Sequence, residues 1–257
     1  MTIIVKMPGT CGELAQGFYR GEPVLMTCPI EKFSTAVVSD EFEGVFGLGL
    51  KSLAILDKVL GVREFKFGVR LKSELPRGKG MASSSADMAA VAQAVALSIG
   101  KSLSPDELGK LCASIEPTDG IFYPGVVVMN PLTGRLIKSI RAQERFQVAV
   151  FDYGGEVDTL TFNRRSDFEF PTLADELDFT LTERSALANQ NILPKRGLED
   201  LMTFAKDLGA VAVNVAHSGT VAGIFFRADD SHVAEKIAAV RSRVDFLDFM
   251  TLTRLAL

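Results

Sequence analysis

The 257-residue chain has no tryptophan, only two histidines, and no apolar run near the roughly eighteen residues that a membrane-spanning helix needs. It also has no excess of positive charge: 28 Lys and Arg stand against 32 Asp and Glu, for a formal net charge of -4. No basic tract is interleaved with aromatic residues. We therefore expect neither a nucleic-acid partner nor a membrane partner.

Cysteine is also scarce, and Cys11, Cys28 and Cys112 lie far apart without a CxxC pair. Three is an odd number, and only His217 and His232 could help these cysteines to bind zinc. A disulfide framework or a zinc site is therefore not expected. The N-terminal residues MTIIVKMPGTCGEL lack the charged-then-apolar pattern of a signal peptide, so the expected location is a reducing cytoplasm.

Hydrophobic residues make up 47% and charged residues 23% of the chain, a balance typical of a globular protein. Runs rich in β-branched residues, or strictly alternating ones, predict strands at 3–7, 23–28, 32–39 and 63–73. Apolar spacing of three and four predicts helices at 48–61, 84–99 and 103–116. The last of these starts with Ser104, Pro105 and Glu107, a capping box with proline at the first position.

The second half of the chain has a different pattern. Three short strands are predicted between 125 and 152, and helical segments dominate from 172 to 207. A strand at 210–216, a small-residue loop at 217–223, a further strand, a helix at 230–242 and a strand at 244–252 follow. The change from strand-rich to helix-rich predicts a domain boundary near residue 152.

The stretch LPRGKGMASSSADMAAVAQAV at 75–95 places Gly78 and Gly80, then serines 83–85, directly before a helix pattern. Glycines let the backbone approach a phosphate, and a helix start adds free N–H groups and a positive dipole end. The serine hydroxyls can cap this helix and reach a phosphate-bound magnesium ion. The stretch is either a phosphate loop or a tight turn before a serine-capped helix.

Two common phosphate loops do not match this stretch. The Walker order is absent around Gly78-Lys79-Gly80, and Ser83 stands where the dinucleotide pattern needs its third glycine. The stretch resembles instead the second motif of the GHMP kinases, P-x-x-x-G-L-G-S-S-A. The departures are Met81 for leucine, Ala82 for the second glycine, and Ser85 inserted before Ala86.

Two further blocks resemble this family in the same order. PGTCGELAQG (8–17) is similar to its N-terminal motif, and NVAHSGTVAG (214–223) to its third, glycine-rich motif. The resemblance implies an α+β fold of two lobes: an N-terminal lobe of the ribosomal-protein type over 1–152, and a C-terminal α/β sandwich lobe over 153–257. It also implies ATP and Mg²⁺ as cofactors, an active site between the lobes, and a possible homodimer.

Within the family, CGELAQG, Cys28-Pro29, KGMASSSAD, CASIEPTDG and NVAHSGTVAG together resemble the L-threonine kinases of the cobalamin and propanediol-utilisation type. Those enzymes make O-phospho-L-threonine for cobalamin biosynthesis. The resemblance therefore implies a small-molecule acceptor, L-threonine. L-homoserine is an alternative acceptor, and a ligand-binding protein without catalysis is another alternative.

The resemblance assigns the triphosphate to the loop and the helix start that follows it: Pro76, Gly78, Lys79, Gly80, Met81, Ala82, Ser83, Ser84 and Ser85. Ser84 and Glu116 are the expected magnesium ligands, although Glu116 could be a solvated residue at a helix end. Lys79 and Ser84 are expected to take part in catalysis. Asp119 is the candidate base for the acceptor hydroxyl, with an Asx turn as the alternative.

The first and third motifs are expected to bind the acceptor. Glu13 could hold its ammonium group, but could equally be a glutamate at a strand edge. His217 could hold the carboxylate or the loop geometry, although a lone histidine is more often structural. The expected acceptor-binding residues are Cys11, Gly12, Glu13, Gln16, His217, Ser218 and Gly219.

Overall fold

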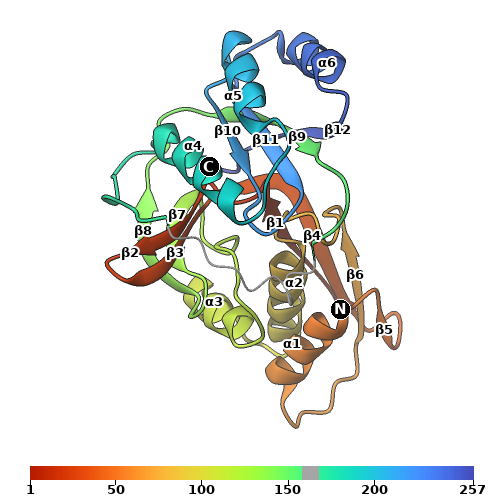
Figure 1. Cartoon of the computed structure of the whole chain (residues 1–257). Helices are drawn as coiled ribbons and strands as arrows, with labels where there is room; N and C mark the ends of the chain where they lie inside the picture. Colours follow the sequence, from red (N-terminus) through yellow and green to blue (C-terminus); the bar gives the residue numbers. More distant parts are fainter. Residues whose placement is uncertain (158–167) are drawn as a thin grey trace.

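Three four-stranded sheets and the helices that cover them make up the computed structural model, which describes residues 1–157 and 168–257 (Figure 1). Two sheets lie in the N-terminal half. The first has the order β1-β4-β6-β5, with β1 Thr2–Thr10, β4 Pro29–Ser39, β6 Gly68–Ser73 and β5 Val45–Phe46. The second has the order β2-β3-β7-β8, with β2 Ala15–Tyr19, β3 Glu22–Thr27, β7 Val126–Asn130 and β8 Arg135–Ile140.

The third sheet belongs to the C-terminal half and has the order β10-β11-β9-β12. Its strands are β10 Ala212–Val215, β11 Val221–Arg227, β9 Phe146–Asp152 and β12 Asp248–Arg254. The helices α4 Phe179–Ala188, α5 Leu198–Asp207 and α6 Val233–Arg243 accompany it, with a short 3₁₀ turn at Asn189–Asn191. The boundary near residue 152 stays a prediction; β9, which precedes it, pairs with strands of this third sheet.

Helix α2, Ser83–Ser98, runs through the middle of the N-terminal half and packs on β1 and β4 (Figure 1). Helices α1, Leu50–Leu60, and α3, Pro105–Ala113, also pack against it. Most of α2 is buried from Ser85 to Ala96, and its run of alanines lets the neighbouring elements approach closely. Its N-terminus therefore has a fixed position in the core.

The predicted α+β fold of two lobes is confirmed, as is the capping box at Ser104 and Glu107. Strand β2 was not predicted, because the first three residues of its sequence AQGFY do not favour a strand and only Phe18 and Tyr19 do. It pairs with β3 across the two-residue turn Arg20-Gly21, where both residues have positive φ, as in a type I′ hairpin. The two-residue strand β5 was also missed.

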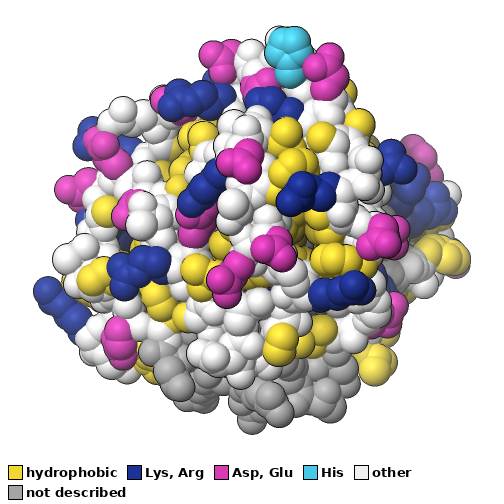
Figure 2. All heavy atoms as spheres, turned by 45° about the horizontal axis from the view of Figure 1, so that its top comes forward, with side chains coloured by type: hydrophobic (Ala, Val, Ile, Leu, Met, Phe, Trp, Pro, Cys, Tyr) yellow, Lys and Arg dark blue, Asp and Glu magenta, His cyan; other side chains and the backbone are white. Residues whose placement is uncertain are grey.

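The C-terminus joins the two lobes. Leu255 donates its amide to the carbonyl of Phe146 at 3.1 Å, and Ala256 donates to that of Pro29 at 2.8 Å. No helix among the described residues has the length and apolar character needed to cross a membrane. On the face in Figure 2, acidic and basic side chains are interspersed among apolar ones, so neither sign dominates there.

Candidate active site

The glycine loop, residues 78–82, has a left-handed backbone conformation (positive φ) at every second residue. Gly78, Gly80 and Ala82 have φ of 71°, 80° and 56°, whereas Lys79 and Met81 between them do not have positive φ. Such alternation turns successive N–H groups toward one side and forms a concave anion-binding nest. The loop therefore has the backbone shape that a phosphate requires.

Hydrogen bonds to the carbonyls hold this shape. The Gly78 carbonyl accepts the Val157 amide at 3.0 Å, and the Lys79 carbonyl accepts the amides of Thr220 at 2.9 Å and Val221 at 3.2 Å. The carbonyls of Gly80 and Met81 accept the amides of Gly12 and Thr10, each at 3.1 Å. A trans peptide is planar, so the N–H of the next residue points opposite to each carbonyl. The amides of residues 79–82 are thus turned away from these segments, and no described residue accepts a hydrogen bond from them.

Close packing explains two of the glycines. A Cβ on Gly80 would lie 2.4 Å from Cβ of Ala216, and a Cβ on Gly219 would lie 2.3 Å from the carbonyl oxygen of Lys79. The third motif therefore packs directly against the glycine loop. Gly219 does not line the cavity described below, and its role is to permit this contact.

The start of α2 differs from the prediction. We expected a serine hydroxyl to cap the helix, but the N-cap is Ala82 in the left-handed conformation, without a side-chain capping bond. Serines 83–85 occupy the first turn instead. Because they do not serve as the cap, the hydroxyls of Ser84 and Ser85 are free to bond to other residues.

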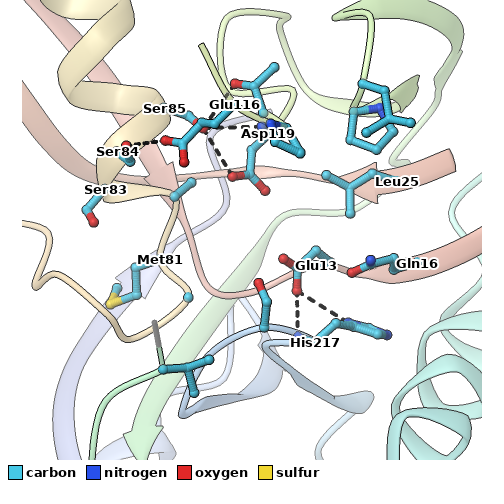
Figure 3. Close-up of a pocket in the computed structure, with 18 of the residues that line it drawn as sticks. Glu13, Gln16, Leu25, Met81, Ser83, Ser84, Ser85, Glu116, Asp119 and His217 are labelled. Atoms are coloured by element: carbon cyan, nitrogen blue, oxygen red, sulfur yellow. Dashed lines mark hydrogen bonds and ion pairs between the residues drawn. The ribbon is translucent and has the colours of Figure 1, made fainter. Parts of the chain in front are cut away.

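Ser84 and Glu116 form a contact at the end of the cavity near α2. The Ser84 hydroxyl donates to Oε1 of Glu116, which follows α3 (Figure 3). Lys51 in α1 forms an ion pair with Oε2 of Glu116. The Glu116 side chain is only 10% exposed. A hydroxyl and a carboxylate from separate elements thus meet beside the nest.

Asp119 lies next to the same turn of α2 (Figure 3). Ser85 donates to Oδ2 of Asp119 at 3.3 Å, while the Ser85 oxygen accepts the Asp119 amide at 3.3 Å and the Thr118 hydroxyl at 3.0 Å. Burial, together with the negative charges of Glu13 and Glu116, raises the pKa of Asp119 to about 7 against the weaker opposite effect of Ser85. A carboxyl group with this pKa can exchange a proton near neutral pH.

Glu13 and His217 form a buried pair across the cavity. Oε2 of Glu13 accepts the His217 amide at 2.7 Å and lies 3.3 Å from Nδ1 of its ring (Figure 3). Burial raises the pKa of Glu13, but the hydrogen bonds from His217 outweigh this effect and leave the pKa below its ordinary value. Glu13 is therefore a carboxylate, and its Oε1 can accept a cation.

The pair continues into α4. Nε2 of His217 lies 2.9 Å from the hydroxyl of Ser185, which accepts the amide of Gln16 at 3.0 Å. The first motif, the third motif and α4 are thereby fixed relative to one another. His217 is a buried positioning residue that also lines the cavity.

A cavity of about 570 Å³ brings most of the expected residues together. The expected site residues that line it are Glu13, Gln16, Gly78, Gly80, Met81, Ala82, Ser83, Ser84, Ser85, Glu116, Asp119, His217 and Ser218. The expected residues outside its lining are Cys11, Gly12, Pro76, Lys79 and Gly219.

Lys79 points away from this cavity. Its amine forms an ion pair with Asp152 at 2.6 Å and donates to the carbonyl of Gly155 at 2.6 Å. Thr220 donates to the other oxygen of Asp152 at 2.5 Å. Lys79 therefore connects the glycine loop to the end of β9, so the structure gives it a structural partner rather than a place in the cavity.

Cys11 and Gly12 support the site from behind. The Cys11 carbonyl accepts a hydrogen bond from the side-chain amide of Asn214 at 2.6 Å. Burial, and to a lesser degree the charge of Glu13, raises the pKa of the Cys11 thiol. Gly12 has φ of 67°, and a Cβ there would lie 2.7 Å from the amide nitrogen of Ala216. These two residues join the first motif to the third.

Several residues were missed by sequence reasoning. Lys51, Asp152 and Ser185 lie in segments without a motif, so no sequence signal marked them. Lys195 is 5% exposed and donates to the carbonyl of Gly219 at 2.8 Å. Burial lowers the pKa of Lys195 to about 8, although the charge of Glu13 opposes this shift.

The glycine loop and the residues that line the cavity fit a nucleotide with bound Mg²⁺. The nest offers N–H donors to phosphate, and two helix N-termini, those of α1 and α2, border the cavity. Mg²⁺ commonly takes one or two carboxylates with substrate phosphates and water, and the Glu116–Ser84 contact offers such oxygens. The volume of the cavity leaves room for an acceptor beside Glu13 and Asp119.

Comparison with known proteins agrees with this geometry. Residues 49–123 match the model of the GHMP kinases N terminal domain. The chain is 29% identical over 246 residues to an L-threonine kinase of Citrobacter freundii, covering 86% of this chain and 85% of the relative. It is 28% identical over 263 residues to the L-threonine kinase of Salmonella typhimurium strain LT2, covering 91% of this chain and 87% of that relative.

The fold has solved counterparts. The mevalonate kinase of Methanococcus jannaschii superposes with a TM-score of 0.73 at 14% identity, covering 100% of this chain and 99% of that one. At this identity the likeness concerns the fold alone. The motifs, the fold and the sequence relatives agree: the chain is similar to the GHMP kinases in its N-terminal domain and in its fold, and similar in sequence to the L-threonine kinases.

Proposed function

We propose that this protein transfers the γ-phosphoryl group of ATP to the side-chain hydroxyl of L-threonine, giving O-phospho-L-threonine. The observation that supports it most is the meeting of a phosphate nest, the Ser84–Glu116 contact and a buried Asp119 in one cavity. The similarity to L-threonine kinases over 86% of the chain supports the acceptor. Cobalamin biosynthesis is the expected use of the product.

Positioning and neutralisation of charge are the main demands of phosphoryl transfer. In our proposal the amides of residues 79–82 hold the phosphates, and Ser84 and Glu116 hold Mg²⁺. The metal would supply charge neutralisation at the phosphate oxygens. The side chain of Lys79 has no part in this assignment, because it is bound to Asp152.

The acceptor would lie between Glu13 and Asp119. An amino acid carries an ammonium group, for which Oε1 of Glu13 is the carboxylate partner. We assign to Asp119 the role of the base that accepts the proton of the hydroxyl. Its pKa of about 7 suits that exchange at neutral pH.

The experiment is a measurement of ADP release from Mg·ATP with L-threonine, L-homoserine, L-serine and no acceptor. Turnover that depends on L-threonine is the expected result. Turnover with L-homoserine alone would keep the kinase and change its acceptor. If ATP binds but no ADP is released with any of the amino acids, the result would favour a ligand-binding protein.

A further inference from the structure

Lys51 occupies an unusual place for a cation. It lies in the first turn of α1, where the helix dipole favours negative charge, and neither an acidic residue in that turn nor a side-chain cap at Gly49 offsets it. Its compensation comes from another element. The ammonium group of Lys51 forms an ion pair with Oε2 of Glu116.

Both oxygens of Glu116 are engaged in this arrangement. Oε1 accepts the hydroxyl of Ser84 and Oε2 the ammonium of Lys51. A divalent cation needs at least one of these oxygens and is repelled by an ammonium group at the same carboxylate. Binding of the cation to Glu116 and pairing of Lys51 with Glu116 therefore compete.

A bound nucleotide would bring phosphate oxygens within reach of a displaced Lys51. Lys51 lines the cavity and its side chain is 29% exposed, so its four-carbon stem can turn inside the cavity. Apart from Lys51, the one lysine or arginine among the described residues of the lining is Arg77, which lies 3.8 Å from Asp87. Lys79 is held by Asp152.

We propose that Lys51 changes partners when Mg·ATP binds: it holds Glu116 in the nucleotide-free protein and pairs with the nucleotide phosphates once Glu116 binds the metal. This role rests on the proposed function of the cavity. It makes the nucleotide and the metal support each other, because metal alone must displace Lys51 without bringing a phosphate group to pair with it. A buried carboxylate is also kept paired in the absence of metal.

The test compares Lys51→Met with Lys58→Met, a substitution of the basic residue in the last turn of the same helix. Mn²⁺ binding without nucleotide is followed by electron paramagnetic resonance, and Mg·ATP binding by calorimetry. For Lys51→Met we expect Mn²⁺ to bind severalfold more tightly, because its competitor is gone. We expect Mg·ATP to bind at least about tenfold more weakly, because a charged contact to phosphate is lost.

Lys58→Met should leave both affinities unchanged, and Lys51→Arg should restore most of the Mg·ATP affinity because the charge remains. Unfolding curves of each variant identify any that fail to fold. If Lys51→Met folds and weakens Mn²⁺ as well as Mg·ATP, or changes neither, the exchange of partners is wrong. A wild-type protein that binds no Mg·ATP would instead contradict the proposed function itself.

Discussion

Asp119 owes its chemistry to the carboxylates around it. Burial and the charges of Glu13 and Glu116 all disfavour its ionised form, and only the hydrogen bond from Ser85 favours it. The resulting pKa of about 7 separates Asp119 from Glu13, whose pKa lies below its ordinary value. Two carboxylates in one cavity are thereby suited to different tasks, proton exchange and cation binding.

The proposed base predicts a pH profile. Asp119 accepts a proton only when it is ionised, so kcat/KM for L-threonine should rise with pH through about 7 and then level off. Asp119→Asn should lower kcat by about 10²- to 10⁴-fold and remove this rise. Initial rates between pH 5 and 9 are the measurement, with Asp57→Asn on the outer face of α1 as the control. A wild-type profile that is flat across pH 7 would show that Asp119 is not the base.

At the level of single residues, motif residues were predictable and their partners were not. Ser84, Glu116, Asp119, Glu13 and His217 stand in recognisable blocks, and the structure places all five in the lining of the cavity. Lys51 and Ser185 complete their contacts from helices far away in the sequence. Lys79 stood inside a motif, but its long side chain turned to Asp152, a direction that no local pattern specifies.

The glycine loop is the element on which the proposed nucleotide binding depends, and Gly80→Ala tests this role. This substitution combines a φ of 80° with a Cβ placed 2.4 Å from that of Ala216. We expect a loss of about 3 kcal/mol or more in unfolding free energy, because backbone strain adds to overlap. ATP affinity should fall as well, because the third motif must move away from the loop.

Gly100→Ala is the matched control for this strain. Gly100 has φ of 77°, but a Cβ there would meet nothing within 4 Å. Gly100→Ala should lower the free energy of unfolding by only about 1 kcal/mol and leave ATP affinity unchanged. Urea unfolding and calorimetric titration measure these two quantities. Equal losses for Gly80→Ala and Gly100→Ala would contradict the packing of the third motif against the glycine loop.

Helices and strands were predictable where periodicity was strong. The helix expected at 48–61 spans Leu50–Leu60, and the one expected at 84–99 spans Ser83–Ser98. The strand predicted over 63–73 shortened to Gly68–Ser73 because only these residues pair with β4. The cap at Ala82 was not predictable, since a left-handed alanine is held there by its neighbours and not by its own preference.

The two halves of the molecule are joined beside the site by the pair of Lys79 and Asp152, whose side chains are 17% and 11% exposed. Removal of one partner leaves a nearly buried charge, so Lys79→Met and Asp152→Asn should each cost about 2 to 3 kcal/mol. The double variant should cost clearly less than their sum. Chemical denaturation of the four proteins gives this coupling energy.

The exposed pair Arg227 and Glu144, 59% and 43% exposed, provides the comparison. Solvent screens this pair, so its coupling should be below about 1 kcal/mol. If the pair of Lys79 and Asp152 shows no more coupling than this one, it does not hold the glycine loop to β9.

The whole account depends on the transfer of a phosphoryl group from ATP to L-threonine in this cavity. The most direct measurement uses ATP labelled with ¹⁸O in its γ-phosphoryl group, with ³¹P NMR of the products formed by the wild-type protein, Ser84→Ala and Glu116→Gln. Labelled O-phospho-L-threonine should form with the wild-type protein, and at least about 100-fold more slowly with either variant. Label found only in inorganic phosphate, or equal yields from the wild-type protein and Glu116→Gln, would contradict it.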